Sequence, residues 1–199
     1  MATTLQPPRS PVRFEKSTSQ MDPAPSRTGV WLGLAAITMT FAALTSAMLV
    51  RQGTSDDWRP LTLPTILYLN MLILIGSSFS LERSRKKFAN PGTGASATLT
   101  LLYVTLGLGL IFIAGQCLAW LQLGAQGLRL ASAPSASFFY VFTGSHALHV
   151  LGGIGALMLV IQRRRKQRLR SSTLEAVSRY WHFMTILWVY LFCLLLQRT

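Results

Sequence analysis

The sequence carries little charge, and very little of it is negative. Only 13% of its 199 residues are Asp, Glu, Lys or Arg, whereas a soluble domain carries roughly a quarter. Six of these residues are acidic and 19 are basic, which gives a formal net charge of +13. Half of all residues are hydrophobic, and the charges stand in short runs between long apolar stretches. This separation excludes an ordinary soluble domain and indicates a membrane protein.

Other missing features exclude further classes of protein. The two cysteines, Cys117 and Cys193, do not form a C-x-x-C pair, so neither a structural zinc site nor a redox pair is predicted. No phosphate-binding loop or dinucleotide fingerprint is present. The apolar stretches lack the buried carboxylate that a proton-coupled transporter needs. The basic residues flank apolar stretches, so nucleic acid is not predicted as a partner.

Five apolar stretches are long enough to cross a membrane as helices. A bilayer core of about 30 Å needs roughly 20 helical residues, because each residue rises about 1.5 Å. Lipid offers no partners to backbone groups, so each stretch must be helical. The predicted fold class is all-α, a polytopic protein with a transmembrane domain over residues 29–199. The predicted spans are about 30–50, 61–81, 97–123, 137–161 and 176–196.

The chain's first 28 residues differ in composition from the rest. They are rich in Pro and Ser and carry four basic residues, so residues 1–28 are predicted to be a disordered tail. The stretch after Met1 has no early apolar core, so it is not predicted to be a secretory signal.

Basic residues alternate between the two sides of the five spans. The tail and the segments after spans two and four hold 14 Lys and Arg, whereas the other side holds 4. The positive-inside rule therefore predicts a cytoplasmic amino terminus and an external carboxyl terminus. The densest run, which could also bind anionic lipid, consists of Arg163, Arg164, Arg165 and Lys166.

Three histidines are the ionisable side chains of interest within the spans. His146 and His149 share one face of span four, and His182 lies near the start of span five. A metal or haem site is one interpretation, but the depths predicted for His146 and His182 differ. The other interpretation, which the sequence favours, is a hydrogen bond from each imidazole to a neighbouring helix. Small residues such as Gly144 are predicted to let helices approach closely, either within the bundle or at a contact with another subunit.

Spans four and five contain a recognisable pattern. Residues 143–150 resemble the T-G-x-H-x-x-H-V signature of subunit III of the haem–copper cytochrome oxidases, and residues 180–183 resemble that family's last helix. Matches to earlier helices follow in the same order, and five spans resemble the shorter bacterial form. The residues that carry the resemblance are Asn70, Gln116, Trp120, Thr143, Gly144, His146, His149, Trp181, His182 and Phe183.

The resemblance implies an accessory subunit without a catalytic, cofactor or metal site of its own. Its partners would be oxidase subunit I, in direct contact, and subunit II, and those subunits would hold the haem and copper. The chain would lie in a bacterial cytoplasmic membrane and bind phospholipids. The opening spans, near Gly33 and Ala36, would contact subunit I. Lipids would lie between spans one and two and the later three spans.

Three departures from the family pattern bear on function. Ile37, Ala119 and Thr185 occupy positions where the family usually has buried acids. We therefore predict structural support of subunit I and no proton collection through those carboxylates. Two alternatives stay open at this point: a subunit III-like component of a quinol oxidase or nitric oxide reductase, and an independent membrane protein that binds b-type haem.

Overall fold

The computed structural model describes residues 27–54, 64–89, 95–128 and 133–197, and these contain helices and no strands. All five helices are long and apolar enough to cross a membrane. They are α1 (Arg27–Thr54), α2 (Ile66–Ala89), α3 (Ala95–Ala125), α4 (Pro134–Arg165) and α5 (Ser171–Leu196). The predicted all-α fold with five spans is confirmed. Residues 1–26 of the predicted tail lie outside the described residues.

The helices extend beyond most of the predicted boundaries. α2 continues to Ala89, eight residues past the predicted end at Leu81, and α5 begins at Ser171, five residues earlier than predicted. The apolar pattern stops at the membrane surface, but a helix continues into water wherever its residues favour it. The sequence therefore placed Glu82 in a loop, whereas the structure places it inside a helix.

Local backbone chemistry sets several helix ends. Pro134 stands in the first turn of α4, where its missing N–H breaks no helical bond. α3 ends before Gly127, whose positive φ of 80° suits glycine, and Leu128 N donates to Leu123 O at 3.1 Å. These caps satisfy backbone groups that would otherwise lack partners.

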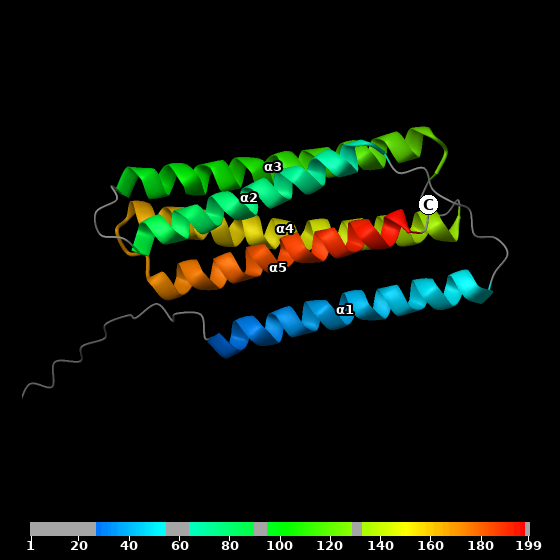
Figure 1. Ribbon diagram of the computed structural model, residues 1–199, viewed down its shortest axis with the longest axis horizontal. Coiled ribbons are helices and arrows are strands. Elements are labelled where there is room, and N and C mark those ends of the chain that lie inside the picture. Colours follow the sequence, from blue (N-terminus) through cyan, green and yellow to red (C-terminus); the bar gives the residue numbers. More distant parts are fainter. Residues whose placement is uncertain (1–26, 55–63, 90–94, 129–132, 198–199) are drawn as a thin grey trace, which may run out of the picture.

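Helices α2 to α5 form a bundle, and α1 stands apart from it. α2 packs on α3 and α5, and α4 packs on α3 and α5 (Figure 1). α1 meets only α4 and α5, over a much smaller interface, and does not pack against α2. The predicted grouping of spans one and two against the other three is therefore wrong, because α2 belongs to the bundle.

The bundle has two distinct ends. The ends of α2 and α4 and the start of α5 lie together, and we call this the basic end because it holds Arg83–Lys87 and Arg163–Arg170 (left in Figure 1). Large apolar side chains cover the outside of the bundle, among them Leu72, Leu121 and Leu148, each about two-thirds exposed. A soluble protein rarely exposes so much apolar surface. This distribution suits a bundle surrounded by lipid.

Candidate functional site

Trp181 of α5 contacts the three other helices of the bundle, α2, α3 and α4. Its indole ring lies between Gly109 of α3 and Gly153 of α4, where an added Cβ atom would meet ring carbons at 2.9 and 3.2 Å respectively. Its Nε1–H donates to Ser77 Oγ of α2 at 3.0 Å. The two glycines thus admit a large aromatic ring, and the hydrogen bond fixes its orientation.

Gly144 does not face another helix of this chain, so the close approach predicted for it within the bundle does not occur, and a subunit contact there stays a prediction. A Cβ atom added at Gly144 would meet nothing within 4 Å, and the same holds at Gly107 and Gly155. The close approaches occur at Gly109, Gly153 and Gly115. Sequence alone cannot separate these groups, because which glycine faces a neighbour depends on helix rotation.

Trp120 and Thr143 connect α3 to α4 on the side of the bundle away from the basic end. Trp120 Nε1 donates to Thr143 Oγ1 at 3.0 Å, and Thr143 Oγ1 donates to Phe139 O at 2.7 Å. The Tyr140 hydroxyl donates to Leu128 O at 3.0 Å and reaches Trp120 O at 3.3 Å. Two of the predicted signature residues therefore meet directly across a helix interface.

The three histidines occupy different surroundings. His146 is fully buried between the rings of Phe112 and Trp188, and neither ring nitrogen has a hydrogen-bond partner among the described residues. His149 Nδ1 lies 2.7 Å from Ser145 O of its own helix. The prediction of a hydrogen bond to a neighbouring helix is thus wrong for both. A metal-binding group of three or more His, Cys, Asp or Glu is also absent from the described residues.

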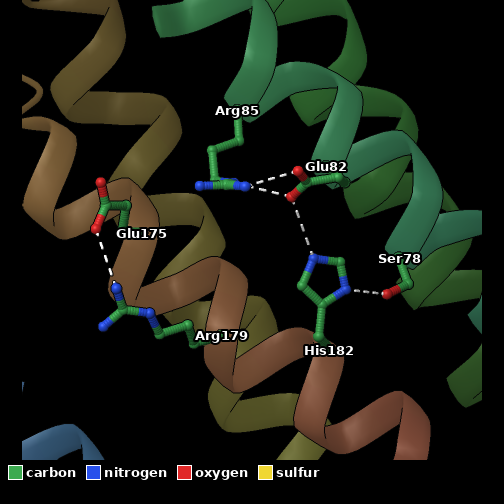
Figure 2. Close-up of polar contacts among 6 residues, drawn as sticks. All are labelled: Ser78, Glu82, Arg85, Glu175, Arg179 and His182. Atoms are coloured by element: carbon green, nitrogen blue, oxygen red, sulfur yellow. Dashed lines mark hydrogen bonds and ion pairs between the residues drawn. The ribbon is translucent and has the colours of Figure 1, made fainter.

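His182 does bond to a neighbouring helix, as predicted. Figure 2 shows its ring between two α2 side chains, with Nδ1 hydrogen-bonded to Ser78 Oγ and Nε2 at 3.5 Å from Glu82 Oε2. Arg85 donates to both carboxylate oxygens of Glu82, from Nε to Oε2 at 2.8 Å and from Nη2 to Oε1 at 2.7 Å. The Glu175–Arg179 pair lies nearby on α5. These groups form a polar contact between α2 and α5 toward the basic end.

The comparisons with known proteins agree with the pattern in these helices. The family model for cytochrome c oxidase subunit III matches residues 31–197. The chain belongs to the cytochrome c oxidase subunit III family. Cytochrome c oxidase subunit 3 of Synechocystis sp. is 34% identical over 175 residues, which cover 83% of this chain and 72% of that protein. The corresponding protein of Thermostichus vulcanus is 33% identical over 177 residues, 84% of each chain. A probable cytochrome c oxidase subunit 3 of Nocardia farcinica is 31% identical over 173 residues, 82% of this chain and 83% of that protein.

The subunit III signature residues do not form one site. Trp120 and Thr143 make one contact, Trp181 makes a second, and His182 makes a third. Phe183 is partly buried and lines a hollow beside α1. Asn70 and Gln116 are almost fully buried, yet their amide groups have no hydrogen-bond partners among the described residues. Most signature residues thus lie at contacts between helices.

The three positions that depart from the family pattern lie in apolar or internally bonded places. Ala119 is fully buried, and Thr185 Oγ1 donates to Trp181 O at 3.1 Å. Ile37 lines a hollow next to α4 and α5.

Glu82 is the carboxylate next to His182, and the sequence interpretation missed it. Glu82 follows Ser78 by one helical turn, so the two side chains share a face of α2. Extending the predicted helix past Leu81 would have identified Glu82 as a neighbour of Ser78.

The basic run at the end of α4 makes one contact with α2. The Arg164 guanidinium lies 4.9 Å from the centre of the Phe88 ring, a favourable cation–π distance. Arg165 and Lys166 are exposed. The side chain of Arg164 therefore helps to join α4 to α2, while part of the run faces outward.

Two apolar hollows lie end to end along the interface between α1 and α5. One, of about 310 Å³, is lined by Thr38, Phe41 and Ala42 of α1 and by Phe183, Ile186, Leu187 and Tyr190 of α5. The other, also about 310 Å³, lies toward the basic end and is lined by Gly29, Val30, Gly33, Leu34 and Ile37 of α1, Ala156 of α4, and Ala176, Val177 and Tyr180 of α5. A third hollow, of about 260 Å³, lies between the basic ends of α2 and α5.

Proposed function

We propose that this chain is the accessory, non-catalytic subunit III of a haem–copper terminal oxidase in aerobic electron transport. The family match carries this proposal, because residues 31–197 include nearly all of the five helices. The relatives named above are cytochrome c oxidase subunits. In this proposal subunits I and II supply the haem and copper, and this chain supplies structural support.

The proposed location is a bacterial cytoplasmic membrane, with the basic end in the cytoplasm. The positive-inside bias supports this orientation, since the basic end holds the runs after α2 and α4. The amino terminus then lies in the cytoplasm and the carboxyl terminus outside.

Subunit I is proposed to dock on the outward face of α1. Only 17% of the apolar window of α1 is buried within this chain, against 50% in α5, so α1 has the most surface to offer. Its outward face carries small residues at alternating spacings of four and three: Ala36, Thr40, Ala43 and Ala47, all exposed. In a membrane, such a stripe allows a second helix to approach closely.

Phospholipid is proposed to occupy the hollows between α1 and α5. Their linings are almost entirely apolar, which suits acyl chains. The hollows run toward the basic end, where the exposed Arg165 and Lys166 would favour anionic headgroups. The lipid would thus fill the space between α1 and the bundle.

The function is tested by isolating the tagged chain in mild detergent and recording absorption spectra before and after partners are removed. Haem that co-purifies and then leaves with a larger subunit supports the accessory role. Haem that stays with the isolated chain contradicts it and points to His146, His149 and His182 as ligands.

The docking face is tested by bulky and charged substitutions on α1. Ala43→Leu and Ala36→Glu are expected to release the chain from the oxidase, because both obstruct close helix contact. Gly107→Leu is the control, since Gly107 has open space around it but lies on α3. Retention of both α1 variants in the purified complex would contradict this interface.

A further inference from the structure

Four helices of the bundle each contribute a buried polar side chain. They are Asn70 of α2, Gln116 of α3, His146 of α4 and Trp188 of α5, and each is at most 1% exposed. Their seven side-chain nitrogen and oxygen atoms all lack a hydrogen-bond partner among the residues that the structure describes. Buried polar groups in proteins are nearly always hydrogen-bonded, so this group requires an explanation.

The contacts between helices bring three of these side chains to one level. Phe112 of α3 touches both His146 and Trp188, with ring centres 5.9 and 5.1 Å apart, and those two rings are 4.9 Å apart. On α3, Gln116 stands between Phe112 and Trp120, one turn from each. Trp120 is hydrogen-bonded to Thr143, which lies one turn from His146 on α4. Gln116 is therefore level with His146.

Asn70 joins the same level from α2. An added Cβ atom at Gly115, the residue before Gln116, would collide with the Asn70 side-chain oxygen. Two contacts set the level of α2 against α5: Tyr68 packs on Phe192, and Ser77 accepts a hydrogen bond from Trp181. Asn70 lies between Tyr68 and Ser77, so it is close to the level of Trp188. All four side chains thus surround one region of the bundle interior.

Direct bonding between the two rings does not satisfy their nitrogens. The His146 and Trp188 rings are tilted by 32° with their centres 4.9 Å apart, and no hydrogen bond joins their nitrogens. The group offers donors from two amides and an indole and acceptors from two amides and an imidazole. A small neutral molecule that both donates and accepts matches this set, and water has that chemistry.

A polar connection leads from this region away from the basic end. Trp120 stands one turn after Gln116 on α3, and Thr143 stands one turn before His146 on α4. The Tyr140 hydroxyl donates to Leu128 O, just past the end of α3. Water that enters at this end would therefore meet polar groups in succession.

We propose that Asn70, Gln116, His146 and Trp188 hold internal water between α2, α3, α4 and α5. The water bridges the amides to the two ring nitrogens and links four helices that have no direct polar contact at this level. This inference does not depend on the proposed function.

The test is water-edited solid-state NMR on the full chain in lipid nanodiscs, with ¹⁵N in the indole nitrogens. Trp188 is compared with Trp181, which is equally buried but donates directly to Ser77. Signals are assigned from Trp188→Phe and Trp181→Phe. Magnetisation from water is expected to reach the Trp188 N–H several-fold faster than that of Trp181. Equal transfer to both, or a Trp188 N–H bonded directly to a side chain, would overturn the proposal.

Two variants test which groups hold the water. Asn70→Leu and Gln116→Met each remove an amide while keeping similar volume, and the Trp181 signal reports whether the bundle remains folded. In a folded variant, transfer to Trp188 is expected to fall toward the Trp181 rate. Undiminished transfer in both folded variants would overturn the assignment, and if neither folds, the comparison in the unsubstituted chain decides.

Discussion

The Trp181 contact makes a sharp prediction about which glycines the fold requires. Gly109→Ala places a methyl group 2.9 Å from the indole ring, and Gly153→Ala places one 3.2 Å from that ring and 3.1 Å from the Tyr180 ring. Gly107→Ala and Gly155→Ala are matched controls, two residues away on the same helices, where the methyl group meets nothing within 4 Å. All four changes gain the same helix propensity, about 1 kcal/mol.

The difference between each variant and its control therefore isolates overpacking. Crowding a well-packed interior costs about 1–3 kcal/mol. The free energy of unfolding of Gly109→Ala is expected to lie below that of Gly107→Ala by this amount, and Gly153→Ala should lie similarly below Gly155→Ala. Both controls are expected to be as stable as the parent chain or slightly more stable.

The assay is unfolding by SDS titration in mixed micelles, followed by circular dichroism. A double-mutant cycle identifies the cause at Gly109, because Trp181→Phe deletes the indole carbons that this glycine faces. In that background the cost of Gly109→Ala should largely disappear. Equal losses for Gly109→Ala and Gly107→Ala, or an unchanged cost beside Phe, would refute the reasoning.

Two further predictions concern polar contacts, one between α5 and α4 and one within α2. The Tyr180 hydroxyl donates to His149 O at 2.8 Å in a partly buried place, so Tyr180→Phe should cost about 0.5–1.5 kcal/mol of unfolding free energy. Tyr190→Phe, which removes an exposed bond to Thr45, is its control and should cost less in the same titration. Glu82→Gln and Arg85→Met should be coupled by about 0.2–1 kcal/mol, as expected for a partly exposed pair. Strict additivity in the double variant would count against their ion pair.

Much of the fold was predictable because the membrane restricts what a chain can do. An apolar stretch of sufficient length must be a helix in lipid, so five stretches predicted five helices. The ends were less predictable, since Glu82 and Arg85 continue α2 beyond the apolar pattern. Helix grouping also failed, because nearly uniform apolar surfaces contain little information about which faces meet.

The candidate site was predictable only as a set of residues. The pattern around His146, His149 and His182 identified the family, which the match over residues 31–197 confirms. It did not predict what those histidines contact. His182 bonds to α2, His149 to its own helix, and His146 lies between two aromatic rings.

The sequence by itself determined that this chain has five membrane-spanning helices and belongs to the subunit III family, because span length, backbone hydrogen bonding and local motifs are properties of short segments. Only the tertiary structure decided that α1 stands apart, that Trp181 needs Gly109 and Gly153, and that Glu82 meets His182. These contacts join residues from different helices, and they depend on the rotation and depth of each helix, which packing sets and no single segment encodes.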